Sequence, residues 1–405
     1  MKLQTLFGLI ITFVLLITSI GVPASSSAAN IDNSISPIEL EPRDPADTVL
    51  RYLQKQADNI ALVSYTADAE GNISTDAPVV KHNANEPMPL ASTIKTVVLA
   101  AYAQQVEQGI LNPNEMIPVS EWEKYYLPST DGFAHFSALD SLGIPYDELG
   151  FALDQSVEVP LDALVTAMIV QSDNAATDYL LQRIGSDAVQ EIIDQAGLEQ
   201  QEIPVSFLGL FLSWFNHESP EQNLDKVERL AALSDEEYRR LMSDLEDQYI
   251  NDVAWREATI SFLRNLSSVN YPFFVSAGEQ LTPQGTANEY AKIMAGVVSG
   301  TFISPEVSAR MRGHLEWPMQ FPAIQERFAA YGVKGGSFQG LITYPLYAVP
   351  KNGDYAGQSR IVVLFMTNMP QNAFTSFSQT AIFEAFELRI ATDARFAAHV
   401  QQAFE

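Results

Sequence analysis

The chain has 405 residues, 47% of them hydrophobic and 18% charged, which is enough for one large or two modest globular domains. Fifty acidic against 23 basic residues give a net charge of -27, which argues against binding of nucleic acids or anionic lipid surfaces. Cysteine is absent, which excludes disulfides and thiolate metal sites.

The N-terminus has the pattern of a secretory signal. Lys2 precedes a mostly apolar run over 6–22, and a stretch rich in serine and alanine ends at Ala29. This order predicts a signal peptide over 1–29 and a secreted, periplasmic or otherwise extracytoplasmic protein. Because the apolar run approaches spanning length, an uncleaved N-terminal membrane anchor is the alternative. Residues 30–45 are expected to form a linker.

The folded domain is expected over residues 46–405, starting with a helix over about 46–58. Two strands, over 59–66 and 78–82, are expected to pair. The helix that opens at Ser92 is largely apolar, which is typical of a central, buried helix. Farther along, an apolar run and acidic helical patterns fill the segment between about 199 and 281.

The C-terminal third returns to strands. Apolar or alternating runs separated by turns predict an antiparallel meander over 331–337, 341–349 and 359–368. With the two N-terminal strands, it would make a five-stranded antiparallel sheet. An amphipathic closing helix over 373–393 is expected on one face with the opening helix, and the remaining helices would form an all-α lobe. The expected fold class is therefore α/β of the α+β type.

Three short motifs follow one another along the chain, and together they predict a serine acylation site: Ser92-Thr93-Ile94-Lys95, Ser172-Asp173-Asn174 and Lys334-Gly335-Gly336. Residues three apart share a helix face, so Lys95 can take the proton of the attacking Ser92 hydroxyl. Burial and a nearby positive charge, which Lys334 could supply, favour a neutral amine at Lys95.

The other two motifs offer matching chemistry. Ser172 would relay a proton to a leaving group, and Asn174 would hydrogen-bond the lysine or the substrate, while Asp173 braces the loop. Lys334 would attract a substrate carboxylate, and glycines such as Gly336 let a substrate lie close against the strand. Each motif alone is a weak signal, since Ser-x-x-Lys is expected about once by chance in such a chain. The prediction of a serine acylation site therefore rests on the presence of all three motifs in this order.

With these motifs the chain resembles the serine β-lactamase and penicillin-binding protein superfamily, most closely the class A β-lactamase type. The resemblance covers about 46–198 and 282–393, so a helical insertion is predicted at about 199–281. That insertion is either a lid that selects bulky substrates or a partner, or additional packing of the α-lobe. The resemblance implies a β-lactamase/transpeptidase-like fold, with the oxyanion held by the backbone amides of Ser92 and Ser337.

Two departures from the family pattern stand out. Family members usually carry serine or threonine where this chain has Gly335, and Ser337 is the residue expected to compensate. The family's deacylation motif, Glu-x-x-Leu-Asn, is not found. Its nearest approximations, at 247–251 and 218–223, are interpreted as solvated carboxylates. This second departure argues against fast β-lactam turnover.

The sequence therefore predicts an exported serine hydrolase that forms an acyl-enzyme, with β-lactamase activity as the leading expectation. A D-alanyl-D-alanine carboxypeptidase or esterase-type penicillin-binding enzyme is one alternative, and a catalytically silent binding module is another. The expected partner is a small molecule, a β-lactam or a cell-wall peptide. No metal or cofactor is implied, and the oligomeric state stays open. The histidines lack metal-ligand spacing and are interpreted as surface or structural residues: His82, His135, His217, His314 and His399.

Overall fold

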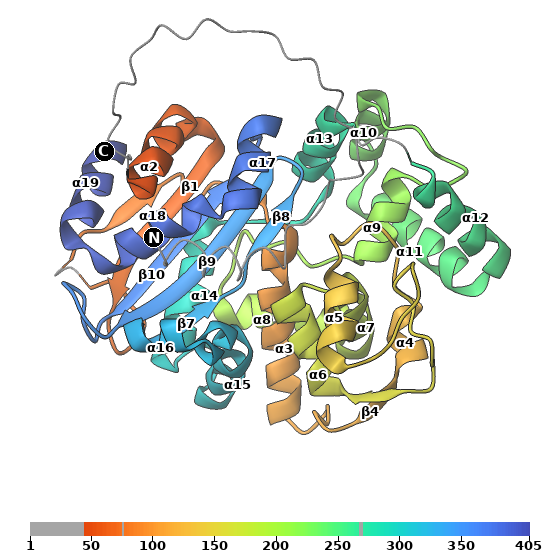
Figure 1. The fold of residues 1–405 in the computed structure, drawn as a ribbon, viewed down its shortest axis with the longest axis horizontal. Coiled ribbons are helices and arrows are strands. Elements are labelled where there is room, and N and C mark those ends of the chain that lie inside the picture. Colours follow the sequence, from red (N-terminus) through yellow and green to blue (C-terminus); the bar gives the residue numbers. More distant parts are fainter. Residues whose placement is uncertain (1–43, 75–76, 267–269) are drawn as a thin grey trace, which may run out of the picture.

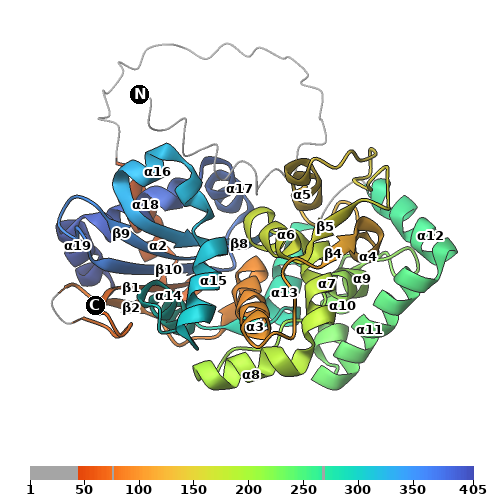
Figure 2. The ribbon, with the colours of Figure 1, turned by 90° about the horizontal axis from the view of Figure 1, so that it is seen from below.

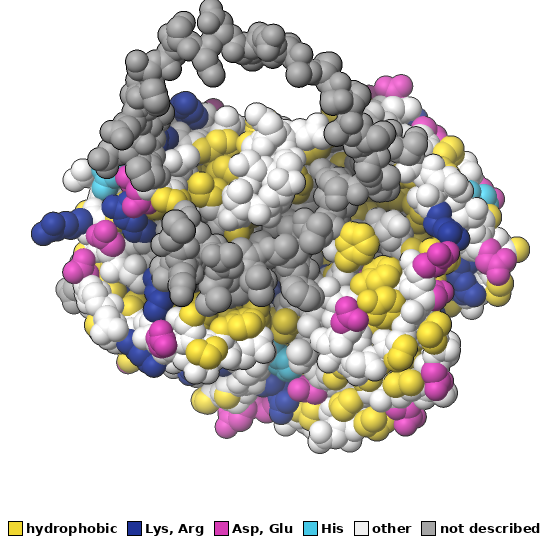
Figure 3. Space-filling model, viewed as in Figure 1, with side chains coloured by type: hydrophobic (Ala, Val, Ile, Leu, Met, Phe, Trp, Pro, Cys, Tyr) yellow, Lys and Arg dark blue, Asp and Glu magenta, His cyan; other side chains and the backbone are white. Residues whose placement is uncertain are grey.

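A computed structural model describes residues 44–74, 77–266 and 270–405. The predicted signal peptide and most of the predicted linker lie outside these residues. One lobe is a sheet with helices on both faces (Figure 1), and the other consists mainly of helices (Figure 2). Acidic and basic side chains are interspersed around the face seen in Figure 3. Within the described ranges, no helix has the length and apolar character needed to cross a membrane.

The central sheet is antiparallel, with the order β2-β1-β10-β9-β7 and with β8 also paired to β9. Six strands occupy five positions, because β7 and β8 follow one another along the same side of β9. The predicted five-stranded antiparallel arrangement is thus confirmed. The strands are β1 Ile60–Ala67, β2 Val80–His82, β7 Phe328–Val333, β8 Gly336–Phe338, β9 Leu341–Pro350 and β10 Ser359–Met366.

The prediction of one continuous strand over 331–337 is wrong, because the chain leaves the ladder at Lys334 and Gly335. Opposite this point β9 carries Pro345, whose carbonyl is 3.4 Å from the Lys334 amide nitrogen. Proline has no N–H to return a hydrogen bond, so the ladder is interrupted there. The break divides the predicted strand into β7 and β8.

Different helices cover the two faces of the sheet. The helices α2 (Pro45–Lys55), α18 (Ile382–Thr392) and α19 (Ala394–Phe404) lie on one face, and α14 (Ala287–Ser299) lies on the other (Figure 1). Because both faces are covered, every residue of β1 is buried. The opening and closing helices share a face, as predicted, but the single helix expected over 373–393 is wrong. It is divided between α17 (Gln371–Thr380) and α18 at Ala381, whose φ of 49° ends α17.

The central helix α3 (Lys95–Glu107) runs between the two lobes and is buried along most of its length (Figure 2). The α15 and α16 helices (Pro305–Leu315 and Pro322–Arg327) lie beside the sheet. Two short strand pairs, β3 (Met88–Pro89) with β6 (Gln284–Gly285) and β4 (Met116–Pro118) with β5 (Glu158–Pro160), complete the described sheets. The all-α lobe contains α4 Val119–Glu123, α5 Ala134–Leu142, α6 Leu161–Thr166, α7 Asn174–Ile184, α8 Ser186–Ala196, α9 Phe207–Trp214, α10 Leu224–Ala231, α11 Asp235–Asn251, α12 Val253–Arg264 and α13 Tyr271–Leu281.

Candidate active site

The first motif lies where a short turn enters the central helix. Ser92 belongs to a 3₁₀ turn, η2 (Ala91–Ile94), and Lys95 is the first residue of α3. The Lys95 ammonium donates hydrogen bonds to the Ser172 carbonyl and to Asn174 Oδ1, both at 2.7 Å. The first two motifs, far apart in sequence, therefore meet through the lysine side chain.

The environment of Lys95 favours its neutral form. The side chain is fully buried, and the ring centroid of Phe207 lies 4.6 Å from Nζ. Burial lowers the pKa of Lys95 to about 7, although the nearby carboxylates of Asp173, Asp178 and Asp131 oppose this shift. Near neutral pH a substantial fraction of Lys95 is therefore a free amine, the form that can accept a proton.

Ser172 connects the two lysines. Its backbone is left-handed, with φ of 67°, directly after the π-helical turn η3 (Ala167–Gln171). Its hydroxyl oxygen accepts a hydrogen bond from Lys334 Nζ at 2.9 Å and lies 3.5 Å from Lys95 Nζ. Burial, and then the charge of Lys95, lower the pKa of Lys334 well below its usual value. A hydroxyl between two buried amines is placed to pass a proton in either direction.

Asp173 braces the loop, as its position in the motif predicted. Its carboxylate caps α7 by accepting the amide hydrogen of Ala175 at 2.8 Å. The Asp173 side chain itself is fully buried. The cap holds Ser172 and Asn174 on either side of it in a fixed orientation.

Strands β8 and β9 closely approach the turn that carries Ser92. Thr343 on β9 donates to the Leu90 carbonyl at 2.8 Å, and its hydroxyl is also 2.8 Å from that of Thr93. A Cβ on Gly336 would lie 2.7 Å from both Leu90 O and Thr93 N, so a larger residue cannot fit without backbone movement. The glycine thus brings β8, with Ser337 next in the chain, against the turn that carries Ser92.

The structure also shows what surrounds Gly335, where family members usually carry serine or threonine. A Cβ at this position would approach the ring of Tyr344 to 3.0 Å, closer than most real contacts of this kind. A serine or threonine here would therefore require that ring to move. The space that a family hydroxyl group needs is occupied by an aromatic side chain.

Hydrogen bonds join four of the predicted site residues, Lys95, Ser172, Asn174 and Lys334. The others, Ser92, Gly336 and Ser337, lie on the adjoining turn and strand. The two stretches closest to a deacylation motif have Asp247 and Glu218 exposed to solvent, as interpreted from the sequence.

Two neighbours of the site were not identified from the sequence. Phe207 covers Lys95, and its amide and that of Leu208 donate to the buried Asp178 carboxylate at 2.8 Å. His135 contacts Asp173, with 3.0 Å between Nδ1 and Oδ2. The apolar run that begins at Phe207 was visible in the sequence, but nothing in it indicated a contact with Lys95.

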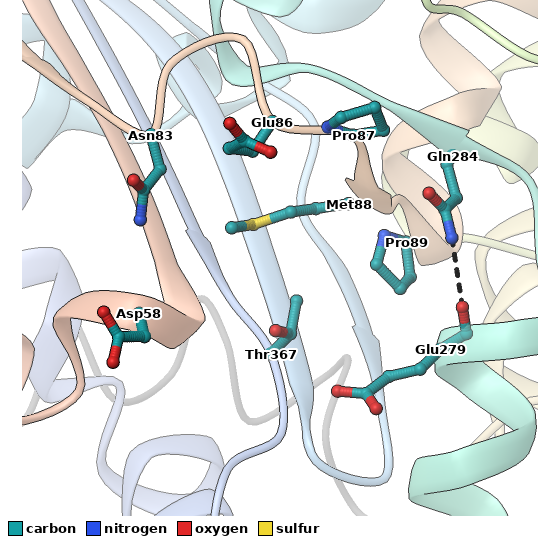
Figure 4. A pocket seen from close by; sticks show the side chains of 9 residues that line it. All are labelled: Asp58, Asn83, Glu86, Pro87, Met88, Pro89, Glu279, Gln284 and Thr367. Carbon is teal, nitrogen blue, oxygen red and sulfur yellow. Dashed lines mark hydrogen bonds between the residues drawn. The ribbon is translucent and has the colours of Figure 1, made fainter.

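A separate hollow of about 420 Å³ opens beside β3 and the end of β10 (Figure 4). It contains none of the motif residues, so it is not the candidate active site. Its lining is mixed polar and apolar: Asp58, Asn83, Glu86, Pro87, Met88, Pro89, Glu279, Gln284 and Thr367.

Comparison with known proteins shows the family and agrees with the fold. The model of the beta-lactamase enzyme family matches residues 52–357. The chain belongs to this family of serine β-lactamase- and penicillin-binding-protein-like hydrolases. The matched range extends across 199–281, so the predicted insertion there stays a prediction.

Among solved structures, the β-lactamase of Sphaerobacter thermophilus is similar over 86% of this chain and 97% of its own, with 16% identity and a TM-score of 0.51. The TLA-1 extended-spectrum β-lactamase has 10% identity over 89% of this chain and 98% of its own, with a TM-score of 0.49. An acyl-enzyme complex of a PBP-A mutant with penicillin G has 14% identity to this chain, covers 87% of this chain and 100% of its own, and has a TM-score of 0.46. No curated protein sequence matches the chain. At these identities the likeness concerns the fold alone.

Proposed function

We propose that this protein is an exported serine hydrolase that forms an acyl-enzyme at Ser92, with a β-lactam amide as the acylating substrate. The observation that carries the proposal is the meeting of the three motifs, in which Ser172 links the buried amines of Lys95 and Lys334. The signal-like pattern over residues 1–29 supports the exported location.

In the proposed acylation, neutral Lys95 accepts the hydroxyl proton as Ser92 Oγ bonds to the substrate carbonyl carbon. The backbone amides of Ser92 and Ser337 would stabilise the oxyanion, a contribution often worth about 3 kcal/mol for one donor. Collapse of the intermediate breaks the carbon–nitrogen bond. Ser172 gives its hydroxyl proton to the departing nitrogen and takes up the proton that Lys95 received from Ser92, across the 3.5 Å between Lys95 Nζ and Ser172 Oγ. Lys334 would hold the substrate carboxylate.

One observation favours a second candidate, a penicillin-binding enzyme of the D-alanyl peptidase or esterase type. The Phe207 ring covers the Lys95 amine, with 4.6 Å between the ring centroid and Lys95 Nζ. An apolar ring excludes water and offers no base that could activate a water molecule. Hydrolysis of an acyl-enzyme is therefore expected to be slow. Asp178 nearby is engaged by the Phe207 and Leu208 amides. A long-lived β-lactam adduct is the behaviour expected of this candidate.

The test is to incubate the mature protein with benzylpenicillin and to follow its intact mass over time. The Ser92→Ala variant is expected to keep the fold and to show no adduct. A wild-type adduct that decays quickly supports β-lactamase activity, whereas a persistent one supports the penicillin-binding enzyme. Labelling that survives in Ser92→Ala would overturn the assignment. The absence of any adduct on the wild type would direct attention to esters or to a silent binding module.

A further inference from the structure

A buried histidine lies behind the second motif, although histidines were expected at surface or structural positions. His135 is fully buried in the all-α lobe. Its Nδ1 lies 3.0 Å from Asp173 Oδ2 and its Nε2 lies 3.4 Å from Glu123 Oε1. Tyr126 stacks on the ring with centroids 3.9 Å apart. Because both ring nitrogens face carboxylate oxygens, only the doubly protonated imidazolium can donate to both.

The surroundings supply more negative charge than one cation neutralises. Asp131 is half-buried, and its carboxylate accepts the backbone amide hydrogen of His135 at 2.9 Å. Glu123 is fixed by the Ala152 amide at 2.7 Å and by the Gln155 side chain at 2.6 Å. The titratable groups that face the ring are thus Glu123 from α4, Tyr126 just after it, Asp131 before α5, and Asp173 at the cap of α7.

These charges bear on the protonation of His135 itself. Burial alone would lower the pKa of His135, but Asp173 and Glu123 outweigh it and raise the pKa to about 9. At neutral pH the ring is therefore a cation among three carboxylates. Burial and the neighbouring Asp173 raise the pKa of Asp131 to about 6.

The same carboxylates act on the catalytic lysine. The negative charge of Asp173 raises the Lys95 pKa more than that of any other carboxylate, and the charge of Asp131 raises it as well. Asp173 also lies between Ser172 and Asn174, the two residues that accept hydrogen bonds from Lys95. A positive charge next to Asp173 therefore reduces the negative field at Lys95.

We propose that His135 is a positioning residue for acylation: its imidazolium holds Asp173 in place and offsets the carboxylate charge that would otherwise keep Lys95 protonated. This inference rests on the proposed function, because it assigns Lys95 the role of base. It adds a determinant outside the three motifs that sets the pH range in which Ser92 is activated.

The test is the pH dependence of the second-order rate constant for acylation by benzylpenicillin in His135→Gln. The half-maximal pH is expected to rise by about one unit, because a charge that opposed protonation of Lys95 is removed. The rate at pH 7 would then fall up to about tenfold, while the limiting rate at high pH is kept. An equal loss at every pH with an unchanged midpoint, the mark of a purely structural role, would overturn the proposal.

Two further variants make the result specific. Asp131→Asn removes a negative charge from the same cluster and is expected to move the midpoint to lower pH. His217→Gln is the matched control, since His217 hydrogen-bonds Thr259 at 2.8 Å in the helical region of α12 and touches none of these carboxylates in the described contacts. A shift of equal size in the control, or one of the same sign in Asp131→Asn, would contradict the proposal.

A direct titration separates this inference from the proposed function. With ¹³C-labelled lysine, the Lys95 Cε resonance, assigned from its loss in Lys95→Met, reports the pKa without any turnover. His135→Gln is expected to raise that pKa and Asp131→Asn to lower it, even if benzylpenicillin does not acylate the wild type. An unmoved Lys95 titration in a folded His135→Gln variant would overturn the proposal independently. If His135→Gln does not fold, the smaller neutral variant His135→Asn takes its place in the same titration, with the same expected rise of the Lys95 pKa.

Discussion

Phe207 lies beside Lys95 and contributes no base to this side of the candidate site. Its ring lies over the ammonium, and its amide is anchored on Asp178. We expect Phe207→Glu to shorten the lifetime of the Ser92 adduct at least about tenfold, because a carboxylate there can activate a water molecule. The measurement is the decay of the adduct mass after free benzylpenicillin is removed.

The matched control is Phe207→Gln, which has nearly the same size but no basic oxygen. Its adduct is expected to persist much longer than that of Phe207→Glu. Equally fast decay in both variants would show that loss of the apolar cover is sufficient and that no base is required. No change in either variant would mean that the ring does not limit deacylation.

At the residue scale, the sequence predicted the members of the site but not what surrounds them. Lys95, Ser172 and Lys334 could be predicted to meet because their chemistry is complementary and the motifs occur in a known order. Phe207 and His135 carry no such pattern. Their places depend on how α5 and α9 pack in the all-α lobe, which is decided by tertiary contacts and leaves no local signal.

At the scale of elements, the contact between β8 and the turn that carries Ser92 leaves no room for a side chain at Gly336. The Gly336→Ala variant is expected to lose about 1–3 kcal/mol of unfolding free energy, because the added methyl presses on Leu90 and Thr93 backbone atoms. Its acylation rate should fall with the displacement of Ser92. Denaturant unfolding and adduct formation measure the two effects.

Gly313 provides the control for this substitution. It lies within α15, and an added Cβ would meet nothing within 4 Å. Gly313→Ala is expected to stabilise the protein by about 0.5–1 kcal/mol, because alanine is the better helix former. Normal stability and labelling in Gly336→Ala would show that the turn and the strand can separate without consequence.

The presence of a helix or strand could be predicted where an apolar run was bounded by turn residues. Whether that helix or strand is unbroken could not be predicted. The break between β7 and β8 is set by Pro345 on a neighbouring strand, so the sequence of 331–337 alone does not contain it. The break at Ala381 has no glycine or proline to mark it. The pairing of consecutive strands, by contrast, could be predicted from apolar runs separated by turns, whereas the pairing of β1 with β10, which joins the two sets of strands, was not predicted.

At the scale of the whole molecule, two buried acids on α18 make stability depend on pH. Glu384 accepts the Tyr344 hydroxyl hydrogen at 2.8 Å, and neither carboxylate oxygen of Glu387 has a partner among the described atoms. Burial raises the pKa of Glu384 from 4.5 to about 8 and that of Glu387 well above its usual value. The folded protein thus holds protons that the unfolded chain releases.

The sign follows from this difference in bound protons. Because the folded state binds more protons, the unfolding free energy falls as pH rises from about 4.5 to about 8, and the Glu384 contribution then levels off. Glu384→Gln keeps an acceptor for Tyr344 but cannot ionise, so it should be more stable than the wild type at pH 8 by a few kcal/mol. Near pH 4 the difference should vanish. Chemical denaturation across this range measures both.

The exposed Glu257→Gln on α12 is the control and should follow the wild-type curve at every pH. A Glu384→Gln curve parallel to that of the wild type would contradict the prediction. So would a difference that grows toward acidic pH. The composition alone could not indicate this behaviour, because it shows fifty acidic residues without showing which of them lie inside the core.

The central strand β10 is also the last strand of the chain. It pairs with β1 so that Ile60 faces Met366, and with β9 on its other side. Pairing between segments so distant in sequence is slow, because the long intervening chain must first close. During synthesis all three motifs emerge before Ser359, yet no central strand joins β1 and β9 until β10 follows. We therefore expect the arrangement of Ser92, Ser172 and Lys334 to form only after β10 has been added, and shorter nascent fragments that already contain these three residues to form no adduct.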